Sequence, residues 1–274
     1  MKFAGIIAEY DPFHNGHAWQ LTQAKALGAE RVAVAMSCSL VQRGALPLLP
    51  EAVRTRSALT CGADLVFALP APCACAGAEA FARAGVALLA AAGCDGLVFG
   101  AETPDAALLM EAAELLDSGS YRAALKAQLA GGARSFAAAR QAAAAQLASD
   151  ERVAALLDKP NNNLAVEYCR AIRSLAPRME AYPLPRQGAN HGEALHSAHG
   201  QFASASALRK LWAEGGADAV APYVPEAVFP LYQEAYAAGQ YTDFSAAGRC
   251  ELALLRSACR GKAPFADTVS YTHL

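Results

Sequence analysis

A short apolar strand that passes into a glycine-containing helix start constrains this chain more than any other stretch. Residues 3–8 are apolar, include two adjacent isoleucines and predict a buried first strand. Asp11-Pro12 ends that strand, because proline donates no ladder hydrogen bond and disfavours helix at the preceding residue. A helical pattern then runs from His17 to about Leu27. The segment His14-Asn15-Gly16-His17 is therefore expected where a strand passes into a helix.

This segment has the residue types that phosphate binding requires. The backbone N–H groups at a helix start are unpaired and carry partial positive charge. Gly16 has no side chain, so a nucleotide can lie against the backbone there. His14 and His17 add two imidazole donors, which predicts stabilisation of charge when the α-phosphorus of a triphosphate is attacked. The alternative for the two histidines is a helix cap plus a surface side chain.

The first hundred residues alternate between strand and helix patterns. Further strands are expected at residues 31–37, 64–69 and 96–99, and helices at residues 51–61 and 77–92. This alternation predicts an α/β fold, a Rossmann-like doubly wound parallel sheet with right-handed crossovers. In such sheets ligands bind beyond the carboxyl ends of the strands. The loops after the strands are therefore the expected site.

The rest of the chain is mainly helical in pattern. An alanine-rich insert spans residues 104–158, with helices expected at 105–116, 121–129 and 135–148, and its plainest interpretation is an exposed helical insert. After it we expect a turn at 159–163, a helix at 164–174, a strand at 179–183, a flexible loop at 186–200, and helices to about residue 260.

The predicted organisation has three parts. Residues 1–215 form a nucleotidyltransferase-like domain that contains the 104–158 insert, and residues 216–268 begin a helical C-terminal region. Residues 269–274 look like the translation of a sequencing-adapter read and are excluded from fold reasoning. The authentic chain is expected to be cut near Thr268.

Composition excludes some classes of protein. The net charge is −2 and the pI is about 6.3, so the overall charge does not indicate nucleic-acid binding, and DNA is not an expected partner. An RNA partner would need a local basic patch. No run of 18 uncharged apolar residues predicts a membrane span, and the start of the chain leaves no room for a signal peptide.

The eight cysteines contain no Cys-x-x-Cys pair and no zinc-type spacing, so we expect a reducing cytoplasm and no metal site. Cys38 lies near the expected site, but no base is visible beside it in sequence. It is therefore interpreted as a structural thiol.

Several separated blocks within residues 1–215 together resemble one family. They are residues 8–17, 41–44, 62–66 with 69–70, 97–102, 159–162 with 164–165, and 203–209. These blocks are similar to the tRNA(Met) cytidine acetate ligase family, a group of HxGH nucleotidyltransferases. The resemblance implies that ATP binds with Mg²⁺, that acetate attacks the α-phosphorus, and that pyrophosphate leaves. The acetyl group of the acetyl-adenylate then passes to the wobble cytidine of elongator tRNA(Met), giving N4-acetylcytidine and AMP.

The resemblance also implies roles for individual residues. His14 and His17 are implied to be catalytic, and Gln42 and Arg43 to contact substrate. The implied nucleotide contacts are Ile7, Ala8, Glu9, Tyr10, Asp11, Pro12, Phe13, His14, Asn15, Gly16, His17, Gly100, Asn161, Arg186, Ser204, Ser206 and Arg209.

Each of these later positions also has a plainer interpretation. Gly100 can be a simple turn. Asn161 or Asn162 can cap the following helix. Ser204 or Ser206 can cap a helix that carries a solvated Arg209. Arg43 and Arg186 can be surface side chains.

The chain departs from the family at several positions. Asp11 stands where the family usually has Asn, Ala45-Leu46 where it has Glu-Pro, Glu51 where it has Lys, and Ala68 where it has Glu. Near Asn190-His191 the family's Tyr-His-Asp run is only partly kept. Two alternatives therefore stay open. One is another adenylyltransferase that acts on a small phosphorylated metabolite, and the other is a catalytically weakened nucleotide- or RNA-binding protein.

Overall fold

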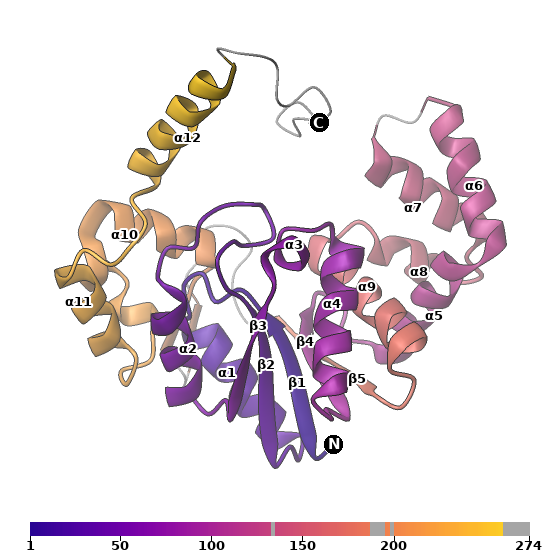
Figure 1. Cartoon of the computed structure of the whole chain (residues 1–274). Coiled ribbons are helices and arrows are strands. Elements are labelled where there is room, and N and C mark those ends of the chain that lie inside the picture. The colour runs from indigo at the N-terminus through magenta and orange to yellow at the C-terminus, as the bar shows by residue number, and fades with distance from the viewer. Residues whose placement is uncertain (133–134, 187–194, 198–199, 260–274) are drawn as a thin grey trace.

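The computed structural model describes residues 1–132, 135–186, 195–197 and 200–259 (Figure 1). Its centre is a five-stranded sheet in the order β3-β2-β1-β4-β5, in which every neighbouring pair is parallel. The strands are β1 Phe3–Ala8, β2 Arg31–Ser37, β3 Leu65–Leu69, β4 Gly96–Ala101 and β5 Glu180–Pro185. The predicted α/β fold with a parallel sheet is confirmed.

Helices cover both faces of this sheet. Their bounds are α1 Asn15–Ala26, α2 Glu51–Thr60, α3 Ala71–Ala74, α4 Ala78–Ala91, α5 Ala106–Asp117, α6 Gly119–Ala130, α7 Phe136–Leu147, α8 Glu151–Leu156, α9 Pro160–Leu175, α10 Ala205–Ala219, the 3₁₀ helix η1 Ala221–Tyr223, α11 Phe229–Ala237 and α12 Phe244–Cys259. One hydrophobic cluster joins the sheet to α4, α5 and α9, and a second joins it to α1, α2, α10 and α11. The molecule is thus a three-layer α/β structure.

The strand order places a crevice at the middle of the sheet. The chain leaves β1 for its neighbour β2 on one side and returns to β4 on the other, so the connections diverge at the β1/β4 pair. Ligands bind at such a switch point, beyond the carboxyl ends of the strands. In Figure 1 these ends lie at the upper edge of the sheet, where α12 projects on one side and α6 and α7 on the other.

The helical insert is anchored more firmly than the sequence predicts. Helices α5 and α8 bury leucines in the same cluster as α4 and α9, whereas α6 buries only Tyr121. Glu167 of α9 is buried and accepts hydrogen bonds from Arg140 of α7 and from Arg170, at 2.7 Å in the second case. Arg170 also pairs with Asp117 of α5. This ionic network connects the insert to the body of the domain.

Helix α10 continues beyond residue 215, where the sequence places a domain boundary. It ends at Ala219, with a non-helical Gly216 (φ 67°) near its end. Trp212 of α10 and Tyr232 of α11 are buried in the same cluster as Ile6 of β1. The beginning of the expected C-terminal region therefore shares its core with the sheet.

Several local predictions need correction. Helix α1 begins at Asn15 rather than His17, because His14 acts as its N-cap. The turn expected at 159–163 is wrong, because Pro160 is already the first residue of α9, a position that proline favours. Strand β4 continues to Ala101, so Gly100 lies within the strand and is not a turn.

The loop expected at 186–200 is wrong in part. Strands β6 (Leu195–Ser197) and β7 (Gly200–Phe202) form an antiparallel pair there. Residues 187–194, 198–199 and 260–274, which include Asn190-His191 and the adapter-like ending, lie outside the described residues. Among the helices that the structure describes, none is long and apolar enough to cross a membrane.

Candidate active site

His14 and His17 form a stacked pair at the start of α1. The Nδ1 atom of His14 accepts a hydrogen bond from the backbone N–H of Gly16 at 3.0 Å, and Nδ1 of His17 accepts from the N–H of His14 at 3.2 Å. The two rings stack with a centroid separation of 3.7 Å. This reciprocal arrangement is a capping box in which both capping side chains are imidazoles.

The capping box fixes the tautomer of both rings. A nitrogen that accepts a backbone N–H carries no proton, so in each neutral ring the proton is on Nε2. Burial lowers the pKa of His14 to about 4, and burial together with its neighbour His14 lowers the pKa of His17 well below the ordinary value. Both rings are therefore neutral at pH 7. Each presents an Nε2–H, and within the described ranges neither Nε2 has a hydrogen-bond partner.

Gly16 is required by this packing. A Cβ atom built at residue 16 would lie 2.9 Å from Cε1 and 3.1 Å from Nδ1 of the His14 ring, which is too close for any side chain. The glycine thus permits the stacked histidine pair, in addition to exposing the backbone to a ligand as the sequence suggests.

Aromatic side chains pack against the histidine pair. The ring of His17 packs edge-on against Tyr10 at 4.8 Å and lies 5.6 Å from Phe13. Both aromatic residues are buried, and the backbone carbonyl of Phe13 accepts a 2.6 Å hydrogen bond from the hydroxyl of Tyr232. Tyr232 belongs to α11, so a helix more than 200 residues away helps to hold the loop that carries the histidines.

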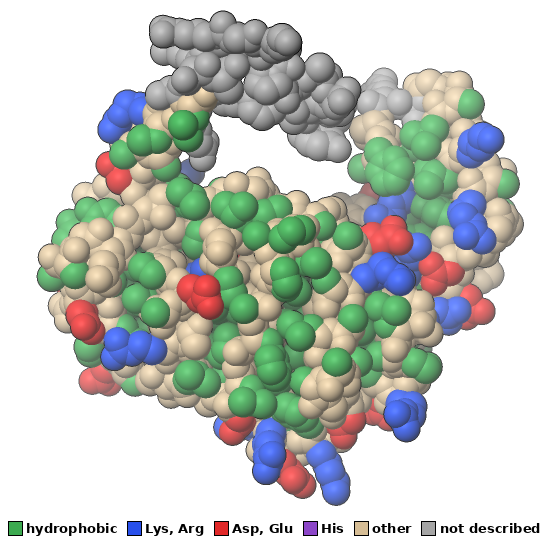
Figure 2. Space-filling model, in the orientation of Figure 1, with side chains coloured by type: hydrophobic (Ala, Val, Ile, Leu, Met, Phe, Trp, Pro, Cys, Tyr) green, Lys and Arg blue, Asp and Glu red, His purple; other side chains and the backbone are tan. Residues whose placement is uncertain are grey.

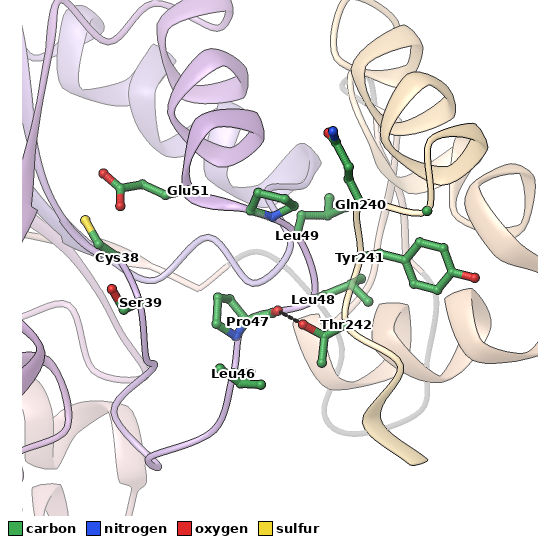
Figure 3. Close-up of a pocket in the computed structure, with 12 residues that line it drawn as sticks. Cys38, Ser39, Leu46, Pro47, Leu48, Leu49, Glu51, Gln240, Tyr241 and Thr242 are labelled. Atoms are coloured by element: carbon green, nitrogen blue, oxygen red, sulfur yellow. Dashed lines mark hydrogen bonds between the residues drawn. The ribbon is translucent and has the colours of Figure 1, made fainter. Parts of the chain in front are cut away.

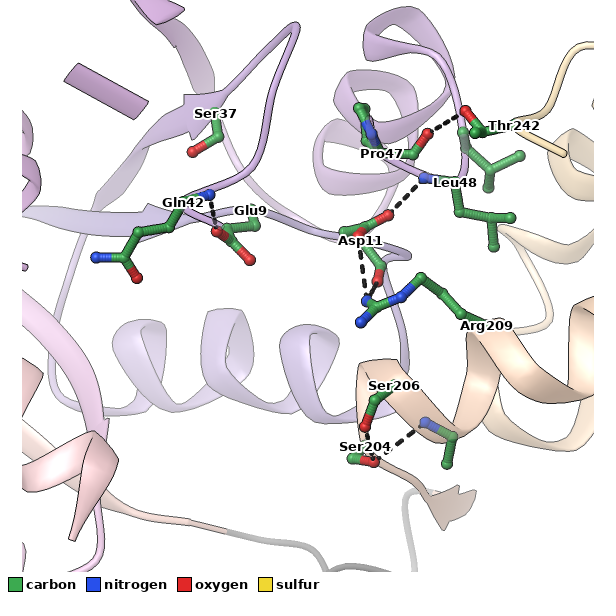
Figure 4. Close-up of polar contacts among 12 residues, drawn as sticks. Glu9, Asp11, Ser37, Gln42, Pro47, Leu48, Ser204, Ser206, Arg209 and Thr242 are labelled. Atoms are coloured by element: carbon green, nitrogen blue, oxygen red, sulfur yellow. Dashed lines mark hydrogen bonds and ion pairs between the residues drawn. The ribbon is translucent and has the colours of Figure 1, made fainter. Parts of the chain in front are cut away.

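Asp11 joins three distant segments. Its Oδ1 accepts from the backbone N–H of Leu48 at 2.6 Å, and its Oδ2 pairs with Nη1 of Arg209 at 3.1 Å (Figure 4). Arg209 also donates to the backbone carbonyl of Asp11 at 2.7 Å. The solvated arginine considered from sequence is therefore wrong. Arg209 positions the loop before α1 through these contacts, and its role toward the nucleotide stays a prediction.

Ser204 and Ser206 lie at the start of α10. Ser204 is the N-cap, because its hydroxyl accepts from the N–H of Ala207 at 3.3 Å, and the two serine hydroxyls lie 3.1 Å apart. The cap interpretation is thus confirmed for Ser204. The preceding strand β7 packs on α1, and Phe202 at its end lies within 3.6 Å of the position that a Cβ of residue 16 would take. The Ser-x-Ser pair is therefore close to the His14 loop.

Asn161, Arg186 and Gly100 gather on the β4–β5 side of the crevice. Arg186 follows β5 and donates from Nη1 to Oδ1 of Asn161, and its nearby charge contributes to the lowered pKa values of His14 and His17. Gly100 is exposed, with Arg186 packed against it. The structure thus brings these three predicted residues to the same side as the histidines.

Glu102 was not predicted as a site residue. Its carboxylate accepts from the side chain of Asn161 at 2.6 Å and from the backbone N–H of Asn162 at 2.7 Å, so it caps α9. The expectation that Asn161 or Asn162 caps the helix is wrong, because both lie inside its first turn. Glu102 follows β4 and lies far from α9 in the sequence, so the residues around the start of α9 do not indicate that it caps the helix.

Arg54 is a second residue that the sequence does not reveal. Its side chain is fully buried and donates to the backbone carbonyls of Glu9 (2.8 Å), Ser37 (2.6 Å) and Leu49 (3.0 Å), and also to that of Cys38. It therefore ties the ends of β1 and β2 to the loop before α2. Burial lowers its pKa.

Glu9 and Gln42 meet at the ends of β1 and β2. Oε1 of Glu9 accepts from the backbone N–H of Gln42 at 2.6 Å, and burial raises the pKa of the carboxyl group. Arg43, the next residue, is exposed. The two predicted substrate residues thus stand on the β2–β3 side of the crevice.

The remaining predicted contacts are mostly supporting residues. Ile7 packs its side chain against Gly85 of α4, Ala8 ends β1, and Pro12 is buried. Asn15 is buried and donates to the carbonyl of Pro222 at 3.2 Å. These residues shape the loop that carries the histidines.

Cys38 is a structural thiol, as expected. It is buried and donates to the carbonyl of Met36, and burial raises its pKa to about 11. A thiol with that pKa is protonated at neutral pH and is not an activated nucleophile.

A cavity of about 490 Å³ lies beside the site, between the loop after β2 and the segment before α12 (Figure 3). Thr242 closes one wall through hydrogen bonds to the carbonyls of Leu48 (2.8 Å) and Pro47 (2.6 Å). Glu51 lines the opposite side, and the ring of Tyr241 points out of the cavity. None of the residues predicted to contact the nucleotide lines it, so it is a neighbour of the site.

The described residues contain no group of three or more His, Cys, Asp or Glu side chains placed to hold a metal ion.

The fold and the histidine pair define a Rossmann-like nucleotide-binding protein with an HxGH loop. The chain belongs to the HIGH Nucleotidyl Transferase family, whose model matches residues 1–258. The sequence resemblance is also confirmed among curated proteins. The chain is 41% identical over 218 residues to the tRNA(Met) cytidine acetate ligase of Syntrophotalea carbinolica, covering 78% of this chain. It is 35% identical over 244 residues to that of Caldanaerobacter subterraneus subsp. tengcongensis, covering 88% of this chain.

Solved structures agree with this assignment. The chain matches Thermotoga maritima TmcAL bound with α-thio ATP at a TM-score of 0.79 and 30% identity, over 88% of this chain and 57% of that one. It matches the apo form at a TM-score of 0.80 and 31% identity, over 88% and 58%. The chain spans only 52% and 60% of the two curated relatives.

Proposed function

We propose that this chain is an ATP-dependent enzyme that activates acetate as acetyl-adenylate and transfers the acetyl group to the wobble cytidine of elongator tRNA(Met). The observation that carries the proposal is the histidine pair, in which both Nδ1 atoms are used by the backbone and both Nε2–H groups are left to donate. Two such donors at a helix start suit a triphosphate. The relatives named tRNA(Met) cytidine acetate ligase supply the acceptors.

In the first half-reaction the carboxylate of acetate attacks the α-phosphorus. A new P–O bond forms, the bond from the α-phosphorus to the bridging oxygen breaks, and pyrophosphate leaves. His14 and His17 donate Nε2–H groups to the phosphate oxygens on which charge builds up, and Arg186 adds a positive charge on the same side. A divalent ion bound to ATP would neutralise part of the charge on its phosphates.

In the second half-reaction the exocyclic amine of cytidine attacks the acetyl carbonyl and AMP leaves. Gln42 and Arg43 lie on the opposite side of the crevice from Asn161 and Arg186, where the acceptor would approach. Such a reaction needs neither coenzyme A nor a covalent enzyme intermediate. We expect an enzyme with a tRNA substrate to act in the cytoplasm.

Two measurements on the isolated chain test the proposal. Calorimetry should detect ATP binding in the presence of magnesium, and absence of binding at millimolar ATP by a folded sample would refute it. Exchange of labelled pyrophosphate into ATP should then depend on acetate. Exchange only with a small phosphorylated metabolite would support a different adenylyltransferase. ATP binding without any exchange would support a weakened binding protein, in which Ala45, Glu51 and Ala68 are the first residues to examine.

A further inference from the structure

Glu9 is a carboxylate at the end of the central strand with one oxygen held and the other open. Its Oε1 accepts the 2.6 Å hydrogen bond from the N–H of Gln42 (Figure 4), and Oε2 has no hydrogen bond or ion pair among the described residues. The side chain is half-buried, and Arg54 holds the backbone carbonyl of Glu9 at 2.8 Å. The open oxygen is therefore fixed in position rather than free to move with a flexible side chain.

The topology places Glu9 between the two halves of the site. Residues proposed for the nucleotide, Asn161 and Arg186, stand on the β4–β5 side of β1. Residues proposed for the acceptor, Gln42 and Arg43, follow β2 on the other side. An acyl group attached to the nucleotide and an amine from the acceptor would meet beyond the end of β1, where Glu9 follows the strand.

The other ionisable groups at this edge cannot accept a proton as readily. His14 and His17 carry their protons on Nε2 and use Nδ1 as backbone acceptors. Both oxygens of Asp11 are occupied, by Leu48 and Arg209. Glu102 is occupied in the same way by the start of α9. Among the described carboxylates that follow β1 and β4 within the crevice, Glu9 keeps an open acceptor.

We propose that Glu9 is the general base of the second half-reaction, which takes the proton from the attacking amine. The inference rests on the proposed function. The step balances as follows: a C–N bond forms between the amine nitrogen and the acetyl carbon, the C–O bond to AMP breaks, and one amine proton passes to Oε2 of Glu9 and then to water. General base catalysis of this kind contributes on the order of 10²–10⁴ in rate.

The charges around Glu9 fit this role. Burial is the largest cause that raises the pKa of the Glu9 carboxyl group, and the charge of Asp11 raises it further. The hydrogen bond from Gln42 and the charges of Arg209 and Arg43 lower it. Tyr168 of α9 also lies close enough for the charge of Glu9 to raise its pKa further. A carboxyl group with a raised pKa is a stronger base than an ordinary one.

The test compares Glu9→Gln with the original chain. Glutamine keeps an amide oxygen that can accept from the N–H of Gln42 but cannot take a proton. Two acceptors report on the adenylate formed from ATP and acetate. Hydroxylamine reacts with the adenylate without help from a base and gives acetohydroxamate, which measures the first half-reaction. A tRNA(Met) anticodon stem-loop, used at low salt, gives N4-acetylcytidine only if the acetyl group is transferred to cytidine, which measures the second. Glu30→Gln is the matched control, because Glu30 is exposed and lies directly before β2, at the end of the strands opposite to Glu9.

The expected result is a fall in the ratio of N4-acetylcytidine to acetohydroxamate by on the order of 10²–10⁴ in Glu9→Gln, with no change in Glu30→Gln. The transfer rate of the original chain should rise with pH through the ionisation of Glu9, and Glu9→Gln should lack that rise. An unchanged ratio overturns the inference. The inference is also overturned if the original chain makes hydroxamate but acetylates no stem-loop. If the original chain forms neither product, the proposed function is contradicted instead.

Discussion

Replacement of His14 separates its structural role from its chemical role. The side chain caps α1 through Nδ1 and presents Nε2–H to the crevice. His14→Ala removes both functions. His14→Asn keeps a side-chain acceptor, because asparagine is among the best N-cap residues, but it removes the imidazole donor.

The two functions predict different magnitudes. Loss of an N-cap side chain costs about 0.5–2 kcal/mol of folding stability. The other bond of the capping box, from the backbone N–H of residue 14 to His17, does not use the His14 side chain and therefore survives in both variants. Loss of one preorganised donor costs on the order of 10²–10³ in rate, or about 2.7–4 kcal/mol. We therefore expect His14→Ala to lose stability and rate together, and His14→Asn to lose mainly rate.

Urea unfolding monitored by circular dichroism measures the first quantity, and acetate-dependent exchange of pyrophosphate into ATP measures the second. Exchange needs no tRNA, so it isolates the half-reaction that His14 serves. If His14→Asn exchanged pyrophosphate at the original rate, the imidazole would be a cap only and the assignment of Nε2 as a donor would be wrong.

Three further outcomes follow from the same structure. Glu167→Ala should destabilise the fold by about 3–5 kcal/mol, because it leaves two arginines without their buried partner, whereas Glu114→Ala, whose pair with Arg173 is exposed, should cost about 0–1 kcal/mol by the same urea assay. The pKa of His14 is lowered to about 4 in the folded protein, so as pH falls the unfolded chain takes up a proton on this ring before the folded chain does. The free energy of unfolding should therefore fall as pH drops from about 6.5 toward 4. This slope should be shallower in His14→Asn, and an equal slope would contradict it. Binding of the chain to tRNA should be weak at physiological salt, because the net charge is −2 and basic side chains are interspersed with acidic ones on the face in Figure 2. A submicromolar Kd in filter binding would show that a basic surface had been overlooked.

The strands were the most predictable part of the fold. Residues 3–8 and 31–37 match β1 and β2 because strands buried on both faces are short, continuous apolar runs. The helix boundaries were less predictable where a side chain from elsewhere completes the helix end. The asparagines at 161–163 favour a turn, yet they lie inside α9 because the carboxylate of Glu102 accepts the N–H groups of its first turn.

The candidate site was predictable only in part for the same reason. The HxGH loop is local, so its position at the start of a helix could be derived from its neighbours. The contact between Asp11 and Arg209 joins residues 198 positions apart, and nothing near Arg209 indicates it. Arg54 and Arg56 stand two residues apart in the same helix, but one is fully buried on backbone carbonyls and the other is exposed. Only the packing of α2 against the strand ends distinguishes them.

The helix start that organises the chain therefore serves folding and chemistry with the same atoms. Because Nδ1 of each histidine accepts a backbone N–H, the tautomer that donates from Nε2 is a consequence of forming α1 correctly. Protonation of either ring would remove that acceptor and weaken the cap. Of the two neutral tautomers, a triphosphate that accepts from both Nε2–H groups favours the one that the helix already requires. Nucleotide binding and helix formation should thus reinforce each other, and Gly16 is the residue that lets the two rings stack closely enough to do both.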